Sequence, residues 1–244
     1  MSRARRLLGI RAQRRVAAKT LKSRICTPLL EPLESRRMLS VTAFYSAQNN
    51  LLSVAGDAAN NTIEISRDAG GNILVNGGSV SISGGTPTVA NTSLVEVFGE
   101  NGDDIVLLNE ANGVLPPAHL YGGGGHDTLT GAGGNDRLVG GPGDDTLTGA
   151  AGNDTYTFDT DLALGTDTLN ESGGGADTLD FSDTTTRIVK LNLANPASQV
   201  VNVGLRLILG SGTTIENAIG GSQNDALVGN SLSNVLTGGG GHDT

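Results

Sequence analysis

The sequence predicts an all-β fold built from stacked repeats, and three observations support this prediction. Four nine-residue units follow one another without a gap from Gly122 to Thr157. Short runs with period-two alternation, bounded by Gly, Asn and Asp, lie on both sides of these units and are typical of half-buried strands. The 244 residues include no Trp, four Phe, three Tyr and 37 Gly, a composition that favours an elongated repeat fold over a globular core.

The chain begins with a basic segment, residues 1–40, which holds 11 of the 16 Lys and Arg but only 2 of the 25 Asp and Glu. We expect a disordered or helical tail with an export or targeting role. Cys26 is the only cysteine, so neither an intramolecular disulfide nor a thiolate metal cluster can form. The run Leu33 to Leu39 (LESRRML) resembles the LEPR-XLL segment of exported bacterial surface proteins, with Ser35 in place of Pro and Met38 in place of Leu. That resemblance implies export.

Residues 41–120 are predicted to be a degenerate stretch of the same repeat fold. Strands are expected at 61–66, 72–76, 79–83 and 93–98. Two segments look like worn copies of the repeat: residues 56–64, with Asn61 where the aspartate belongs, and residues 99–107, with Asp104 in place. Whether these two turns bind metal or are ordinary turns is left open.

The repeat block, residues 121–158, is the most regular part of the chain. Each unit has glycine at its first and fourth places, aspartate at its sixth and a large apolar residue at its eighth. The first six residues predict a turn and the last three a short strand, with two units to a coil. Residues 18 apart should therefore stack at about 4.8 Å, which pairs Asp127 with Asp145 and Asp136 with Asp154.

Beyond the block the spacing changes, because Asp154, Asp167 and Asp177 are 13 and 10 residues apart. We expect stacking to be interrupted there by a wider β segment, residues 159–219, with strands at 187–193, 199–203 and 205–209. The repeat pattern resumes at residues 220–244, a second and truncated block. Asn234 replaces an aspartate in it, so at most one weak site is expected, between Asp225 and Asp243.

Stacked aspartates repel one another by up to about 3.5 kcal/mol at an effective dielectric of about 20, unless a cation lies between them. Ca²⁺ accepts about 6 to 8 oxygen ligands in irregular geometry, whereas Mg²⁺ prefers a smaller octahedron and zinc prefers His or Cys. His126 and His242 occupy the fifth place, where other units carry Asn or Asp, so they are expected to be polar turn residues. The candidate calcium ligands are the aspartate side chains and glycine carbonyls of Gly123, Gly125, Asp127, Gly134, Asp136, Gly141, Gly143, Asp145, Gly152, Asp154, Asp225 and Asp243.

The nonapeptide pattern resembles the RTX, or haemolysin-type, calcium-binding repeat. This resemblance implies a parallel β-roll or β-solenoid with calcium bound in the turns. A disordered Gly/Asp linker is the alternative, but four units in register with a fixed aspartate argue against it. Collagen is excluded because the period is nine and not three.

Residues 41–244 hold only 5 Lys and Arg against 23 Asp and Glu, which argues against nucleic-acid binding. No apolar run approaches the roughly 18 residues of a membrane span. HExxH, G-x-S-x-G and P-loop motifs are absent from the sequence, so we expect no catalysis within it. The sequence therefore predicts a bacterial calcium-binding protein, extracellular or at the cell surface, with a structural or adhesive role and an unidentified surface or matrix partner. The alternative is the non-catalytic N-terminal part of a secreted enzyme or toxin whose active domain lies beyond residue 244.

Overall fold

A computed structural model describes residues 41–171, 173–210 and 214–244, so the basic segment and its resemblance at Leu33 to Leu39 lie outside the described residues. Only one helix occurs in the described ranges, the 3-10 turn η1 (Asn76–Gly78), and none there has the length and hydropathy of a membrane span. The strands are β1 (Thr42–Ser46), β2 (Leu51–Ala55), β3 (Thr62–Arg67), β4 (Ile73–Val75), β5 (Ile82–Ser83), β6 (Leu94–Asn101), β7 (Ile105–Asn109), β8 (Ala118–Gly124), β9 (Thr128–Thr130), β10 (Arg137–Val139), β11 (Thr146–Thr148), β12 (Thr155–Thr157), β13 (Gly165–Leu169), β14 (Asp177–Asp180), β15 (Lys190–Asn192), β16 (Gln199–Asn202), β17 (Leu205–Ile208), β18 (Ile215–Ile219), β19 (Ala226–Val228) and β20 (Val235–Thr237).

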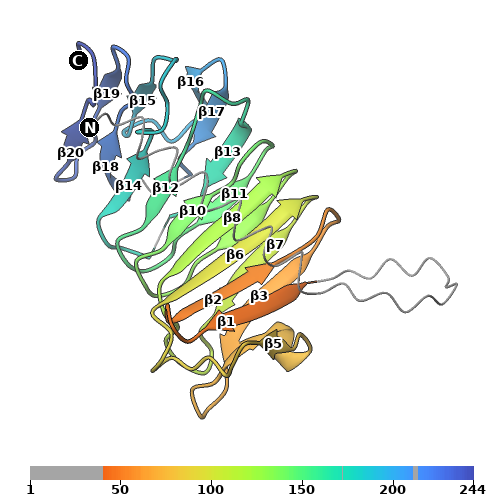
Figure 1. Ribbon diagram of the computed structural model, residues 1–244. Coiled ribbons are helices and arrows are strands. Elements are labelled where there is room, and N and C mark those ends of the chain that lie inside the picture. Colours follow the sequence, from red (N-terminus) through yellow and green to blue (C-terminus); the bar gives the residue numbers. More distant parts are fainter. Residues whose placement is uncertain (1–40, 172, 211–213) are drawn as a thin grey trace, which may run out of the picture. The chain divides into compact units, whose positions relative to one another are not determined.

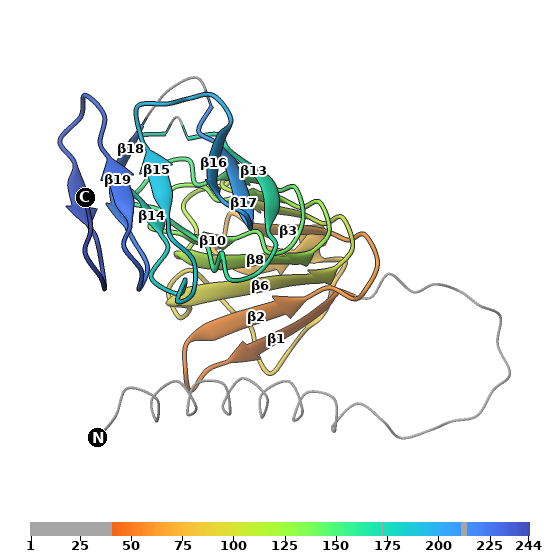
Figure 2. The same cartoon turned by 90° about the horizontal axis from the view of Figure 1, so that it is seen from above.

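Two mainly parallel sheets face each other along a stack of coils (Figures 1 and 2). Sheet A has ten strands in the order β20-β18-β14-β12-β10-β8-β6-β2-β1-β5, and sheet B has eight in the order β16-β17-β13-β11-β9-β7-β3-β4. Strands β15 and β19 pair separately. The chain alternates between the sheets through the repeat block, since β8, β10 and β12 belong to one and β9 and β11 to the other. The predicted all-β fold of parallel stacked coils is confirmed.

The strand register confirms that two nonapeptides make one coil. Leu129 pairs with Leu147 across β9 and β11, and Leu138 pairs with Tyr156 across β10 and β12, each pair being 18 residues apart. Serial pairing of this kind places each residue above its counterpart in the next coil. The eighth-place residues therefore form columns inside the stack.

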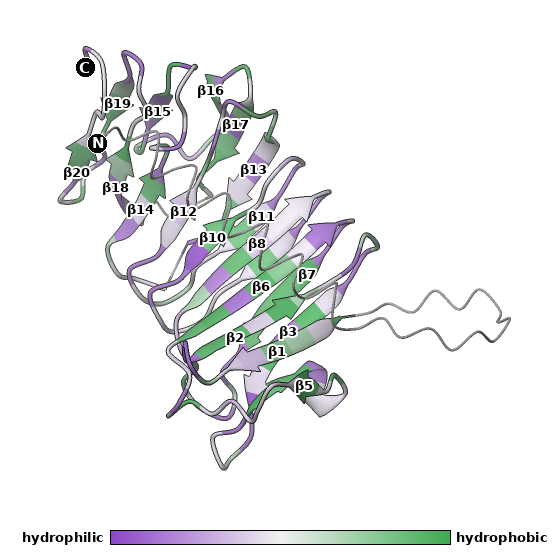
Figure 3. Cartoon of the chain, in the orientation of Figure 1, coloured by the Kyte–Doolittle hydropathy of each residue, from purple (hydrophilic) through white to green (hydrophobic). Residues whose placement is uncertain are grey.

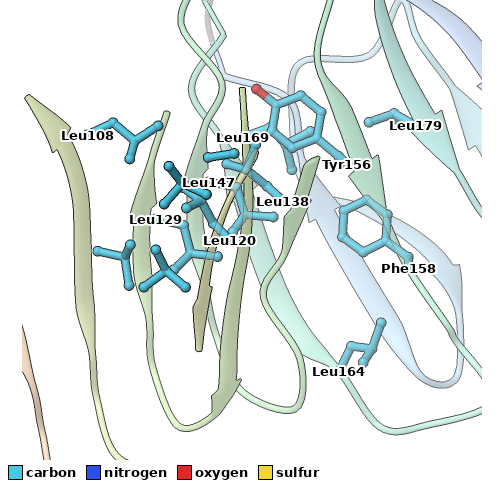
Figure 4. Close-up of a cluster of buried hydrophobic side chains, with 14 of the residues drawn as sticks. Leu108, Leu120, Leu129, Leu138, Leu147, Tyr156, Phe158, Leu164, Leu169 and Leu179 are labelled. Carbon is cyan, nitrogen blue, oxygen red and sulfur yellow. The ribbon is translucent and has the colours of Figure 1, made fainter. Parts of the chain in front are cut away.

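The core between the sheets consists of one inward side chain from each short strand. Leu129, Leu138, Leu147 and Tyr156 have no exposed surface (Figure 4), while their neighbours in the strands are partly exposed except for the buried Thr157. Hydrophobic and polar positions alternate along the strands, and polar residues gather in the turns (Figure 3). Because the strands are only three residues long here, a single side chain per strand provides nearly all the apolar burial.

The predicted interruption of stacking after the repeat block is wrong. β13 pairs in parallel with β11, with Thr168 opposite Thr146, and β14 pairs in parallel with β12, with Thr178 opposite Thr155. The segment between β12 and β13 absorbs the extra residues as a loop, which places Phe158 inside the stack against Phe181, with ring centroids 5.2 Å apart. A change in sequence spacing therefore lengthens a coil without breaking the column.

The two ends of the described stack differ from the repeat block. The strands expected at 61–66, 72–76, 93–98, 187–193, 199–203 and 205–209 are present as β3, β4, β6, β15, β16 and β17, whereas only two residues of the strand expected at 79–83 form a strand, β5. β20 pairs with β18, but Val235 and Leu236 remain 65% and 39% exposed. The last coil therefore lacks the cover that buries the repeat-block leucines.

Truncating a buried eighth-place leucine should destabilise the stack far more than truncating a leucine on its outer surface. Leu147→Ala leaves a cavity in a column with no exposed surface and is expected to cost about 3 kcal/mol of unfolding free energy in saturating calcium. The matched control is Leu107→Ala, whose side chain is 37% exposed and should cost less than about 1 kcal/mol. Urea unfolding followed by circular dichroism measures both, and equal losses would contradict the assignment of the core.

Candidate metal site

Aspartates line the turns at both edges of the stack. We call Asp104, Asp127, Asp145 and Asp167 the sheet-B row, because the first three come directly before β7, β9 and β11 and Asp167 lies within β13. Asp136, Asp154 and Asp177 are the sheet-A row, because the first two come directly before β10 and β12 and Asp177 is the first residue of β14. All seven side chains are buried, with at most 3% exposed.

One oxygen of each aspartate is held by the backbone of the preceding coil. In the sheet-B row, the N–H of Asp104 donates to Oδ1 of Asp127 at 2.8 Å, and the N–H of Asp127 donates to Oδ1 of Asp145 at 2.8 Å. In the sheet-A row, the N–H of Asp136 donates to Oδ1 of Asp154 at 2.8 Å. The same contact recurs between Asp145 and Asp167 and between Asp154 and Asp177. The backbone thus fixes the position of one carboxylate oxygen, Oδ1, and does not bond the other, Oδ2.

The second oxygen has no hydrogen-bond partner within the described residues at six of the seven positions: Oδ2 of Asp104, Asp127, Asp145, Asp154, Asp167 and Asp177. A buried carboxylate oxygen without a partner is strongly unfavourable. Asp136 is the exception, because its Oδ2 accepts from the N–H of Ala132 at 3.2 Å. Six free carboxylate oxygens in two rows, all hard donors, fit a hard divalent cation.

The first-place glycines make room for these oxygens. Oδ2 of Asp127 lies against Gly122, and Oδ2 of Asp145 against Gly140, so closely that a Cβ on either glycine would overlap the carboxylate. The fourth-place glycines have a second role: Gly125 and Gly143 adopt φ of 137° and 148°, which only glycine tolerates well. The absence of side chains at these glycines therefore leaves room in the turn for the carboxylate oxygens and the backbone.

The fifth-place residues form a further chain of hydrogen bonds along the outside of each row. The N–H of His126 donates to Asp103, and Nδ1 of His126 accepts from the N–H of Asp144 at 2.9 Å. Asn135 accepts in the same way from the N–H of Asn153. His126 is thus a polar, hydrogen-bonded turn residue, the role expected for the fifth place.

Burial raises the pKa of the row carboxyls. Loss of hydration is the main cause, and repulsion from neighbouring carboxylates adds to it, while hydrogen bonds from the preceding coil act in the opposite direction. The pKa rises to about 6 for Asp127, about 7 for Asp145 and Asp154, and about 8 for Asp167. Without a cation, these carboxyls hold protons at a pH where exposed aspartates do not.

The predicted ligands fall into three groups. The first group belongs to the connections that lead into β9 and β11 and consists of Gly123, Gly125, Asp127, Gly141, Gly143 and Asp145. The second belongs to the connections that lead into β10 and β12 and consists of Gly134, Asp136, Gly152 and Asp154. The third, Asp225 and Asp243, forms its own pair, in which the N–H of Asp225 donates to Asp243 at 2.8 Å. This last pair differs from the rows, because Asp225 Oδ2 accepts from the N–H of Gly221 and Asp243 is exposed.

Sequence reasoning missed several members of the rows as candidate ligands. The nine-residue spacing does not predict Asp167 and Asp177 as ligands, although each is followed by Thr and Leu, as Asp127 and Asp145 are in the repeat block. Glu216 takes the next place after Asp177, accepting from its N–H at 2.8 Å. The Asp-Thr-Leu signature was the signal for the first two, whereas nothing local marks Glu216.

Comparison with known families identifies the repeat block. Residues 121–156 match the RTX calcium-binding nonapeptide repeat, in four copies, and residues 170–244 match the C-terminal segment of the peptidase M10 serralysins. The chain therefore carries RTX repeats, and these repeats bind calcium. No solved structure matches the chain.

Curated relatives match over a short stretch. A metalloprotease AprA of Pseudomonas entomophila is 50% identical over 65 residues, and a serralysin of Photorhabdus laumondii is 47% identical over 64 residues. In both cases the match covers 26% of this chain and 13% of the relative. The chain thus spans about an eighth of the length of the curated relatives it matches.

Calcium affinity should rise with pH, because the ion displaces protons from the rows. An exposed, unfolded aspartate has a pKa of about 3.9, so the raised folded values stabilise the cation-free fold at low pH, and this contribution is lost as pH rises from about 4 to about 8. We expect apparent calcium affinity to rise about tenfold between pH 6 and pH 8 for each displaced proton. Calorimetric titrations in two buffers of different ionisation enthalpy measure affinity and proton release together. An affinity that is constant over this range, with no proton release, would contradict the raised pKa values.

Proposed function

We propose that the two aspartate rows hold calcium ions between successive coils, and that the chain is a calcium-dependent structural module. The observation that carries this proposal is the set of six buried carboxylate oxygens without a partner, two or more to each row. Their regular placement, beside a first-place glycine at Asp104, Asp127, Asp145 and Asp154, supports one repeated site over several unrelated ones. The ligands would be row aspartates together with glycine carbonyls of the turns.

Calcium suits these turns better than magnesium does. The donors are carboxylate and backbone oxygens spaced by the height of a coil, and Ca²⁺ accepts such long, irregular arrangements more readily than Mg²⁺ does. The cation would also replace repulsion between row carboxylates with shared coordination. Since each short strand buries only one large side chain, ion binding would contribute a substantial part of the folding free energy.

The location of such a module follows from its ion. Sites built for weak binding fill in extracellular fluid, where calcium is far more abundant than in the cytoplasm, so we place the protein outside the bacterial cell, secreted or at the surface. A structural or adhesive role with a surface or matrix partner accords with an acidic repeat stack that lacks catalytic motifs.

A second candidate role is suggested by the match of residues 170–244 to the serralysin C-terminal segment. On this hypothesis the chain is a non-catalytic, calcium-binding part of a secreted enzyme. The Pseudomonas entomophila relative is a metalloprotease by name, and the Photorhabdus relative is a serralysin. Determining the complete coding sequence would separate the two roles, because only the second requires a catalytic domain in the same polypeptide.

Calcium, but not magnesium at the same concentration, should order residues 121–158. We expect a β-type circular dichroism signal to grow with calcium, with apparent affinity of about 10⁻⁴ to 10⁻³ M, as in extracellular calcium modules. Titration of the full chain with each ion provides the measurement. A signal that is already complete in chelator and unaffected by calcium would contradict the proposal.

Aspartates of one row should be energetically coupled, and aspartates of different rows should not. The N–H of Asp127 donates to Asp145, whereas Asp136 lies in the other row. A double-mutant cycle with Asp127→Asn and Asp145→Asn should therefore show an interaction energy of about 1 kcal/mol or more in calcium-induced stability. The cycle with Asp127→Asn and Asp136→Asn is the control and should be additive within about 0.5 kcal/mol. Equal coupling in both cycles would contradict sites confined to one row.

A further inference from the structure

We propose that Asp154, Glu171 and Asp177 form a three-carboxylate cation site, the tightest in the chain, and that Glu171 is a ligand which the nonapeptide pattern does not provide. This inference rests on the proposed calcium binding by the rows and adds a specific ligand to it. One carboxylate oxygen from each of the three residues lies within 4.8 Å of the others. The three side chains are 0%, 5% and 0% exposed.

Two carboxylate oxygens of the cluster are buried and available to bind a cation. Oδ1 of Asp154 and of Asp177 is held by the preceding coil, and Oδ2 of each has no hydrogen-bond partner in the described residues. Three carboxylates this close and this deeply buried repel one another unless a cation or protons neutralise them. A cation that binds the free oxygens removes both the repulsion and the missing contacts.

Glu171 is held in place by contacts that no other coil has. The hydroxyl of Tyr156 donates to Oε2 of Glu171 and accepts from the N–H of Gly149 at 2.7 Å, while Oε1 accepts from the N–H of Gly173 at 3.0 Å. Gly149 is also the first-place glycine against which Oδ2 of Asp154 lies. The tyrosine therefore brings the glutamate to the same glycine that the free aspartate oxygen faces.

The sequence explains why this carboxylate occurs once. Asp167 and Asp177 are ten residues apart, one more than the repeat allows. Counting from Asp167 as the sixth place puts Leu169 at the eighth and Asn170 at the ninth, so Glu171 is the inserted residue. Tyr156 is likewise unusual, because the other three units of the block carry Leu at the eighth place. The inserted Glu171 and the substituted Tyr156 are in contact in the structure, because the tyrosine hydroxyl donates to the glutamate.

Charge favours this cluster over the other turns. The sheet-B turns offer two carboxylates per pair of coils, whereas this turn offers three, and calcium affinity rises with the number of charged ligands. The site should thus fill first with calcium or with a lanthanide, which takes similar oxygen ligands. Terbium is a useful probe, because a nearby tyrosine sensitises its emission, and the chain has three Tyr and no Trp.

The test is a terbium titration of the full chain with excitation of tyrosine. Sensitised emission should appear with the first equivalent of terbium in the unchanged protein. Tyr156→Phe should abolish this first phase while the calcium-induced circular dichroism signal remains. The matched control is Tyr121→Phe, since Tyr121 stacks on Phe98 and bonds Arg137 away from the cluster, and this variant should keep the first phase.

Affinity provides the second measurement. Glu171→Gln should weaken the tightest calcium-binding phase in calorimetry by about tenfold or more and leave the later phases unchanged. Glu64→Gln is the control, because Glu64 accepts from Asn109 and belongs to neither row, and it should change no phase. Unchanged first-phase affinity in Glu171→Gln, or first-phase emission that survives in Tyr156→Phe, would overturn the proposal. If Glu171→Gln does not fold, the Tyr156→Phe result decides. Failure of the unchanged protein to bind calcium at all would instead overturn the proposed function.

Discussion

The structure depends on buried carboxylates that recur along its turns, six of which have one oxygen bonded and the other free in the described residues. The bonded oxygen accepts from the backbone of the preceding coil, as Asp145 does from Asp127, and so links one coil to the next. The free oxygen faces a glycine and carries the charge that burial makes unfavourable. The same side chain thus aligns one coil with the next and creates the need for a cation.

This arrangement explains why so small a core suffices. A three-residue strand buries one leucine, worth about 1.5 to 3 kcal/mol, which is little against the ordering cost of a nine-residue unit. The aspartate at the turn decides the balance, because its contribution to the free energy of folding is unfavourable without a cation and favourable with one. On the proposed function, folding of the stack therefore depends on ion concentration, whereas a larger apolar core would not need the ion.

Much of the repeat block could be predicted from its sequence, and what could not has physical reasons. The nine-residue period determines which aspartates stack, and the pairs of Asp127 with Asp145 and Asp136 with Asp154 have the expected partners. Continuity past Thr157 could not be predicted from spacing, because a loop that leaves the stack changes the count without changing the register. Glu171 was also beyond reach, since its role depends on Tyr156 and Gly149, which only the folded coil brings beside it.

The rows end where the carboxylates stop. The sheet-B row begins at Asn61, whose N–H donates to Asp104 but whose own side chain is a neutral amide. Beyond Glu216, the sheet-A row passes to Asn234, whose amide bonds the carbonyl of Glu216. The side-chain oxygen of Asn61 accepts from the N–H of Asp57, and that of Asn234 accepts from the N–H of Asn230, so each amide is satisfied within its own turn and adds no charge. In a stack whose stability is a sum of neighbouring contacts, turns with a neutral amide add no ion-dependent contribution of their own. Val235 and Leu236, which follow Asn234, remain exposed, so neither a carboxylate in their own turn nor a complete core stabilises that strand in the described residues.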